Sequence, residues 1–175
     1  MSRAMSNLSF RMMSFGFKVR DFFKPRDAIL ADVGIKQGHF VLDYGCGPGS
    51  YVKKTAELVG AEGRVYALDI HPLAINKVKK LAREKGFDNV ETINSDCYTG
   101  LADASIDIVL LYDTFHNLEN TDAVLAELHR VLKTDGILSI SDHHLSDDEI
   151  ESGICSSGLF TLASRGEKTH SFKKA

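Results

Sequence analysis

The chain has 175 residues and a mass of 19.3 kDa, with 43% hydrophobic and 26% charged residues, as expected for one globular domain. These values exclude a collagen-like, a disulfide-stapled or a mainly disordered protein. The formal net charge of -3 gives no overall attraction to nucleic acid or to an anionic membrane. The longest apolar run, residues 108–112, is too short to span a bilayer. Three widely spaced cysteines without a CxxC motif favour a cytoplasmic location.

The N-terminal segment has an unusual composition. Residues 1–20 contain four basic residues, four serines and no acidic residue, and they hold all four methionines. Methionine and phenylalanine form an adaptable apolar surface that can close over a cleft and open again. We therefore expect residues 1–24 to act as a lid or cap. An ordinary docked helix, a targeting peptide and a membrane-surface segment remain open alternatives.

From residue 25 onward, helices and strands alternate. Pro25 and Pro72 can each open a helix, and Gly34, Gly60 and Gly86 can each close one. The predicted elements in chain order are a helix from Pro25 through Val33, a strand at 39–44, a helix at 52–59, a strand at 64–69, a helix at 72–85, strands at 90–95 and 106–112, a helix around 124–132, a strand at 136–141, a short helix that the capping box of Ser146 and Glu149 opens, and strands at 159–164 and 169–173.

This alternation predicts one α/β domain over residues 25–175. Its fold is a Rossmann-like, doubly wound, mostly parallel seven-stranded sheet with an antiparallel C-terminal hairpin and helices on both faces. In such sheets, ligands bind beyond the carboxyl ends of the strands, where the strand order reverses. The residues that follow each strand are therefore the candidates for function.

A glycine-rich loop, Asp43-Tyr44-Gly45-Cys46-Gly47-Pro48-Gly49, follows the first strand. Its three glycines allow a sharp turn and a close approach of the backbone to a ligand. Asp69 ends the second strand, where a carboxylate can accept both hydroxyls of a ribose. A dinucleotide loop needs a glycine where Ser50 stands, and Asp43 would repel a pyrophosphate. A P-loop is excluded because no lysine follows. The pattern favours a nucleoside ligand that carries a positive charge.

Four motifs carry a resemblance to a known family: VLDYGCGPG at 41–49, ALDI at 67–70, NSDC at 94–97 and LHRVLKTDG at 128–136. The sequence resembles the class I methyltransferases that depend on S-adenosylmethionine (SAM). It is most similar to small stand-alone members of the ubiquinone/menaquinone-biosynthesis and arsenite methyltransferase group. The motifs cover roughly residues 25–145, a span that fits one ordinary domain. The resemblance implies that SAM is the cofactor.

The resemblance also implies roles for individual residues. The loop residues Gly45, Cys46, Gly47 and Gly49 would hold the methionine part, and Asp43 would be oriented toward its ammonium group through water. Asp69 would hold the ribose, and Ile70 would flank the adenine. Asp96 would accept a hydrogen bond from the adenine amino group, with Cys97 beside it. Tyr112 and Asp113 would form the wall near the sulfonium.

Methyl transfer from a sulfonium is an in-line displacement that mainly needs alignment and a dry site. A general base helps only where the acceptor must lose a proton. His116 follows the fourth strand, and Asp142, His143 and His144 follow the fifth. Each histidine could be a base or a hydrogen-bonded wall residue, and we predict that His116 and His143 are the catalytic residues. The separations along the chain of the possible metal ligands fit no compact metal signature, so we expect no metal site. These ligands are Asp113, His116, His143 and His144.

The acceptor is constrained only by what the sequence lacks. No Asn/Asp-Pro-Pro-Tyr/Phe pattern follows the fourth strand and no basic stripe is present, so we expect no nucleic-acid partner. With no insertion for a substrate domain, only the N-terminal segment can cover the acceptor. The candidates for its apolar wall are Phe15, Phe17, Phe22 and Phe23. We therefore expect a small, partly apolar acceptor, or one exposed on a partner protein. The cysteines are not arranged as in the arsenite group, which argues against arsenic chemistry.

Three functions stay open at this point. A SAM-dependent methyltransferase leads. A non-catalytic SAM-binding or partner-activating subunit comes second, because no catalytic base is certain. A nucleotide-binding oxidoreductase comes third, because the glycine spacing and Asp43 disfavour it. A homodimer is compatible with each of them.

Overall fold

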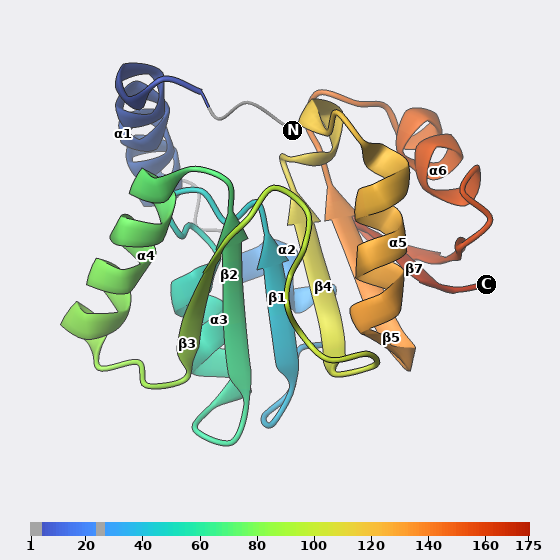
Figure 1. Cartoon of the computed structure of the whole chain (residues 1–175), viewed down its shortest axis with the longest axis horizontal. Coiled ribbons are helices and arrows are strands. Elements are labelled where there is room, and N and C mark those ends of the chain that lie inside the picture. The colour runs from blue at the N-terminus through green and yellow to red at the C-terminus, as the bar shows by residue number, and fades with distance from the viewer. Residues whose placement is uncertain (1–4, 24–26) are drawn as a thin grey trace.

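The computed structural model describes residues 5–23 and 27–175, and it contains one seven-stranded sheet with the order β3-β2-β1-β4-β5-β7-β6 (Figure 1). The strands are β1 (Phe40–Tyr44), β2 (Arg64–Asp69), β3 (Val90–Asn94), β4 (Ile106–Tyr112), β5 (Leu132–Ser141), β6 (Phe160–Arg165) and β7 (His170–Lys174). Strands β1 to β5 pair in parallel, and β7 is antiparallel to both β5 and β6. The predicted Rossmann-like sheet with its antiparallel hairpin is confirmed.

Helices cover both faces of this sheet (Figure 1). They are α2 (Asp27–Ala31), α3 (Val52–Val59), α4 (Pro72–Lys85), α5 (Thr121–Val131) and α6 (Asp147–Cys155), with a short 3-10 helix, η1 (Phe115–Asn117). One buried cluster joins sheet residues to Ile29, Val52 and Val78 from α2, α3 and α4. A second cluster joins the sheet to Leu125 and Ile154 from α5 and α6. The sheet is therefore buried between two apolar layers.

Local signals in the sequence set most of the helix ends. The helix α4 begins after His71, whose Nδ1 accepts a hydrogen bond from the Leu73 N–H at 3.1 Å. It ends at Gly86, which has the left-handed conformation typical of a helix terminus. Ser146 and Glu149 form the predicted capping box at the start of α6.

The predicted strand ends agree with the structure within one residue except at β5, and two helices also differ by more. The helix α5 begins at Thr121, three residues before its predicted start. The strand β5 begins at Leu132, directly after α5, because Leu132 pairs with Ile106 before the register shifts between Ile106 and Ile108. The first helix of the domain is shorter than predicted, because α2 covers Asp27–Ala31 and Val33 lies in the following turn. Pro25, its predicted start, lies outside the described residues.

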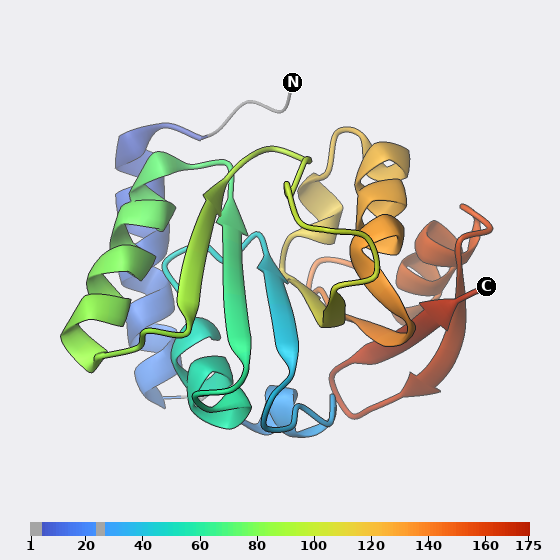
Figure 2. The same cartoon turned by 60° about the horizontal axis from the view of Figure 1, so that its bottom comes forward.

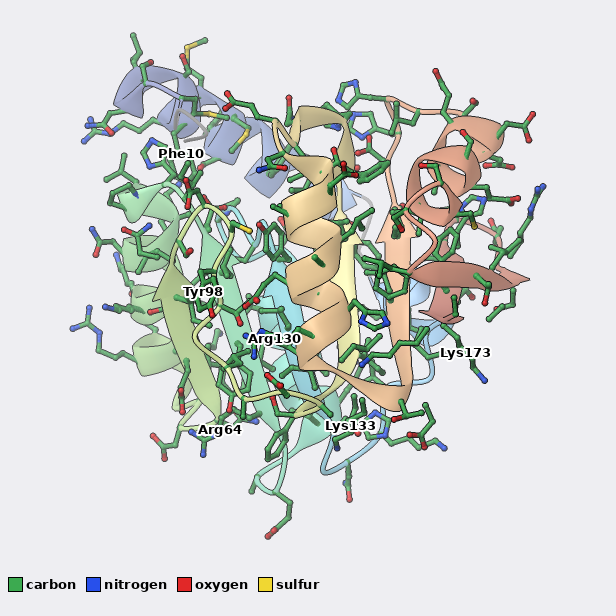
Figure 3. The ribbon with its side chains drawn as sticks, turned by 45° about the vertical axis from the view of Figure 1, so that its right-hand side comes forward. Phe10, Arg64, Tyr98, Arg130, Lys133 and Lys173 are labelled. Atoms are coloured by element: carbon green, nitrogen blue, oxygen red, sulfur yellow. The ribbon has the colours of Figure 1, made fainter. Side chains whose placement is uncertain are left out.

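The N-terminal helix α1 (Asn7–Phe23) lies beside α4 in two views (Figures 1 and 2). Phe10, which Figure 3 labels, is 1% exposed and stacks on His71 with 4.3 Å between ring centroids. Phe15 is 69% exposed, so the prediction that it forms an apolar wall is wrong. The side chains of Phe22 and Phe23 lie outside the described residues. Among the described residues, no helix is long and apolar enough to cross a membrane.

Candidate active site

A cavity of about 210 Å³ lies at the carboxyl ends of the central strands, where α1 contributes part of the wall. Most of the residues predicted to bind the cofactor line it: Gly45, Cys46, Gly47, Asp69, Ile70, Asp96 and Tyr112. Asp43, Gly49 and Cys97 lie outside this lining. Residues from α1 and its N-terminal approach complete the wall with Met5, Met13 and Phe17. The structure therefore brings the predicted cofactor motifs together around one cavity.

Asp43 lies in β1 directly before the glycine loop and is 2% exposed. Its Oδ2 atom is buried and has no hydrogen-bond partner among the described residues. Burial and the nearby negative charge of Asp69 raise the pKa of Asp43 to about 7. A buried carboxylate oxygen without a partner is costly unless a ligand or a water satisfies it. Asp43 therefore fits a cofactor that carries an ammonium group.

Asp69 holds the glycine loop in place. Its Oδ2 accepts a hydrogen bond from the Gly47 N–H at 2.8 Å, and its Oδ1 accepts one from the His71 N–H at 2.7 Å. Burial raises the pKa of Asp69, and the two backbone donors oppose that rise by stabilising the carboxylate. Each carboxylate oxygen keeps a further lone pair that a ribose hydroxyl can use.

Gly45 marks a close approach between two loops. Its φ is +80°, in the region that favours glycine, and a Cβ atom here would lie 2.7 Å from Cγ2 of Thr114. A side chain at Gly45 would therefore collide with the segment that follows β4. The glycine loop and the Thr114 segment can share one cavity only because this position has no Cβ.

A polar clamp fixes the loop that follows β3. Glu127 on α5 accepts hydrogen bonds from the Thr99 N–H at 2.8 Å and the Thr99 hydroxyl at 2.6 Å. Hydrogen bonds from Arg130, together with those from Thr99, lower the pKa of Glu127 to about 2. Arg130 also lies 5.6 Å from the ring centroid of Tyr98, and Figure 3 labels both side chains. Tyr44 reaches the same loop by donating a hydrogen bond to the carbonyl of Asp96 at 3.1 Å.

The segment after β4 forms the other side of the cavity. Asp113, Thr114 and Asn117 line it, and Asp113 has a φ of +51°, which is unusual for a residue other than glycine. His116 is not in the lining. Its Nδ1 lies 2.8 and 2.9 Å from the two carboxylate oxygens of Asp142, and its Nε2 lies 2.6 Å from the side-chain nitrogen of Asn117. Since Asp142 can only accept, Nδ1 carries the proton and Nε2 offers a lone pair.

His143 faces a second cavity of about 540 Å³. Its Nδ1 lies 2.7 Å from Oδ1 of Asp113, and Asp113 lines both cavities. The ring of His144 contacts both other imidazoles. Its centroid lies 3.9 Å from the ring centroid of His143 and 4.1 Å from that of His116. The structure thus gathers every predicted candidate for base catalysis at the ends of β4 and β5, beside the cofactor cavity.

The family of the chain follows from comparison with known proteins. A family model described as a methyltransferase domain matches residues 35–169. The chain belongs to this family of class I SAM-dependent methyltransferases. The resemblance identified from the sequence motifs is thereby confirmed, and SAM is the cofactor of the family.

Individual relatives of this methyltransferase-domain protein include biosynthetic enzymes. Demethylmenaquinone methyltransferase of Geobacillus stearothermophilus is 29% identical over 77% of this chain and 59% of its own length. The ubiquinone/menaquinone biosynthesis C-methyltransferase of Hydrogenovibrio crunogenus is 34% identical over 74% of this chain and 50% of its own length. The chain spans about half the length of the curated relatives that it matches. A SAM-dependent methyltransferase from Aquifex aeolicus has the same fold, with a TM-score of 0.76, 24% identity and coverage of 90% of this chain and 96% of its own.

Sequence reasoning missed several residues of the candidate site. The cavity is also lined by Ser50, Tyr51, Asn117 and Leu118. Glu127 does not line the cavity but holds the loop after β3 through Thr99. Ser50 and Tyr51 directly follow the glycine motif, so their position along the chain was a usable signal. Nothing in the sequence near Thr99 points to Glu127, because that contact depends on the packing of α5.

Proposed function

We propose that this chain transfers a methyl group from SAM to a small, partly apolar acceptor. The observation that supports this most is the cavity itself. Its glycine loop is held by Asp69, and Asp113 and Thr114 form the other side. Asp43 lies in β1 directly before that loop, outside the lining, and its buried Oδ2 has no hydrogen-bond partner among the described residues. A cationic amino-acid nucleoside fits this combination better than a phosphate chain does.

The cofactor supplies an activated methyl group on a sulfonium. The chain's own residues then bind and align. Gly45, Cys46 and Gly47 let the backbone approach the methionine part, with Gly49 completing the turn and Asp43 balancing the ammonium charge. The nucleoside is held by Asp69 at the ribose, by Ile70 beside the adenine, and by Asp96 and Cys97 at the adenine edge. Tyr112 closes the wall near the reacting carbon.

The acceptor lies on the side of η1 in this proposal. Where an acceptor must lose a proton, we assign its uptake to His116 Nε2, because Asp142 keeps the other ring nitrogen protonated. His116 lines neither cavity, so this role requires Asn117 to move away from Nε2. His143 is the second candidate for proton transfer, oriented by Asp113. In-line attack then needs little more than alignment and the exclusion of water.

The N-terminal segment, residues 1–24, acts as a lid over the acceptor. Met13 and Phe17 from α1 line the cavity, while Phe10 anchors the helix on His71. An apolar lid suits a partly apolar acceptor, and two relatives are named for demethylmenaquinone and aklanonic acid as their substrates.

Two measurements test the proposed function. Melting temperatures with SAM, with S-adenosylhomocysteine and with NAD should rise with the first two only, because a ligand stabilises the state that it binds. Formation of S-adenosylhomocysteine should then appear with at least one member of a panel of phenols, enols and amines. Stabilisation by NAD alone would reject the proposal in favour of an oxidoreductase.

Binding of SAM without turnover of any acceptor would favour the second candidate, a SAM-binding or partner-activating subunit. One structural neighbour, with a TM-score of 0.77 and 16% identity, comes from a complex between the Trm112 methyltransferase activator of Haloferax volcanii and a putative methyltransferase, and this likeness shows the fold alone.

Light scattering on the purified protein decides whether the chain forms the homodimer that the sequence left open.

A further inference from the structure

A cluster of metal-binding side chains lies where the loops after β4 and β5 meet. One ligand atom each from Asp113, Asp142 and His143 lies within 4.8 Å of the other two. Sequence spacing gave no reason to expect such a site, because Asp113 and His143 are separated along the chain and meet only through the parallel pairing of β4 with β5. We propose that Asp113, Asp142 and His143 bind a divalent transition-metal ion, against our expectation from the sequence.

The chemistry of the three side chains supports an ion of this class. Two carboxylates supply negative charge and hard oxygen ligands, and one imidazole adds a nitrogen ligand. This mixture suits Mn²⁺, Fe²⁺ or Zn²⁺ better than Mg²⁺ or Ca²⁺, which prefer oxygen alone. Ligand bonds of about 2.1 Å allow ligand atoms at most about 4.2 Å apart across an ion. The three ligand atoms lie within 4.8 Å of one another, so a small side-chain rotation brings them to bonding distance and leaves further coordination positions open.

The two carboxylate ligands are anchored before any ion arrives. Asp142 is 6% exposed and accepts hydrogen bonds from the backbone N–H groups of His116 and His144, both at 3.1 Å. The protonated Nδ1 of His116 lies 2.8 Å from the same carboxylate. Such outer donors commonly orient a metal-binding carboxylate and tune its affinity. Asp113 is fixed by its left-handed backbone and by the hydrogen bond from its N–H to the Ser141 carbonyl at 2.7 Å.

A second observation indicates that the adjacent cavity takes a ligand. His170, 6% exposed, lines the second cavity together with the three proposed ligands. Neither of its ring nitrogens has a hydrogen-bond partner among the described residues, and the nearest carboxylate oxygen of Asp147 lies at 3.5 Å. Asp147 and Glu151, at 3.5 and 4.0 Å, serve Nε2 as ion-pair partners, whereas the buried Nδ1 has no polar partner among the described residues and is free for a ligand or a water. An ion at the three ligands would have coordination positions open toward this cavity.

The proposal also separates the roles of two histidines. A metal-bound His143 cannot accept a proton from the acceptor, so the base role falls to His116. The ion would sit beside Asp113, which lines both cavities, and therefore at the border of the cofactor site. The site itself needs neither SAM nor an acceptor, so its test does not depend on the proposed function.

Metal binding is measured on the untagged full chain. Mn²⁺ is titrated while the signal of the free ion is followed by electron paramagnetic resonance, and Zn²⁺ is measured by competition with a chromophoric chelator. We expect one saturable site per chain. His143→Gln should weaken binding at least tenfold and should remove the nitrogen coupling from the bound Mn²⁺ spectrum. The side chain of His143 is 63% exposed, so this variant is expected to fold.

Two further variants keep the test sharp. Asp113→Asn should also weaken binding at least tenfold while keeping the backbone, since asparagine tolerates the left-handed conformation. His39→Gln is the matched control, because His39 precedes β1 at the opposite end of the sheet, and it should bind like the parent protein. The proposal is overturned if neither ion binds at millimolar concentration, or if His143→Gln binds both ions as tightly as His39→Gln does.

Discussion

At the scale of single residues, the carboxylate of Asp69 has a structural role and a proposed binding role. It holds the Gly47 and His71 N–H groups, and in the proposed function it also accepts the ribose hydroxyls. We expect Asp69→Ala to weaken SAM binding by about 1–3 kcal/mol through the loss of charge-assisted hydrogen bonds. Isothermal titration calorimetry measures this change. Asp88→Ala, at an exposed aspartate, is the control, and equal affinities of the two variants would refute the ribose assignment.

If Asp43 balances the ammonium group as proposed, SAM binding should depend on pH. Its pKa is about 7 in the folded protein, against a usual value of 3.8, so the ligand-free protein is protonated there below pH 7. An ammonium group favours the ionised form, so affinity should fall as the pH drops from 7 toward 5, by up to about tenfold per unit. Asp43→Asn should flatten this dependence, measured by titration across pH.

Asp43 also affects the stability of the ligand-free protein, but here a rise in pH lowers the stability, whereas it raises the affinity for SAM. The folded state holds the proton of Asp43 up to a pH of about 7, whereas the unfolded state loses it near 3.8. The free energy of unfolding should therefore decrease as the pH rises from 4 to 7, as far as Asp43 contributes. A parent protein and an Asp43→Asn variant with identical pH slopes, both in affinity and in stability, would contradict the assigned pKa.

At the scale of elements, the glycine loop packs so closely against the segment after β4 that a Cβ atom at Gly45 would collide with Thr114. We expect Gly45→Ala to lower the free energy of unfolding by roughly 2–4 kcal/mol, because strain at a positive φ adds to the collision with Thr114. Gly47→Ala is a matched control. It also has a positive φ, of +52°, but a Cβ there meets nothing within 4 Å, so only the strain of about 1–2 kcal/mol applies. Chemical denaturation measures both, and equal losses would show that Thr114 moves aside freely.

The predictability of these elements depended on how local their causes are. The helix α4 was predicted to the residue, because Pro72 and Gly86 set its ends within the chain itself. The start of β5 was not, because it depends on the pairing of Leu132 with Ile106 across the sheet. Cofactor residues after β1 and β2 gathered as predicted, since strand ends meet at one edge. The pairs Asp113–His143 and Asp142–His116 required side-chain geometry that no spacing encodes.

At the scale of the whole molecule, α1 packs against the start of α4 through the stacking of Phe10 on His71, and its Met13 and Phe17 complete the wall of the cavity. Deletion of residues 1–20 should therefore speed the release of S-adenosylhomocysteine and reduce turnover by about tenfold or more, while the melting temperature changes only modestly. Stopped-flow dissociation and thermal unfolding measure the two effects.

Leu8→Ala serves as the control for this deletion, because Leu8 is 71% exposed on α1 and should leave both quantities unchanged. If the deletion abolishes folding, Met13→Ala keeps the helix and removes only a cavity contact, and it should still speed release. A collapse of stability in the deletion, together with unchanged release in Met13→Ala, would identify the segment as structural.

The absence of a side chain at Gly45 also has a thermodynamic consequence. Because Thr114 lies directly against the cofactor loop, a movement that either ligand imposes on one segment is felt by the other. Linkage requires this influence to be mutual: whatever factor the acceptor applies to the dissociation constant of the cofactor, the cofactor applies to that of the acceptor. Ordered addition of substrates, or synergy between them, would then originate in a contact between two loops and not in a rearrangement of the sheet.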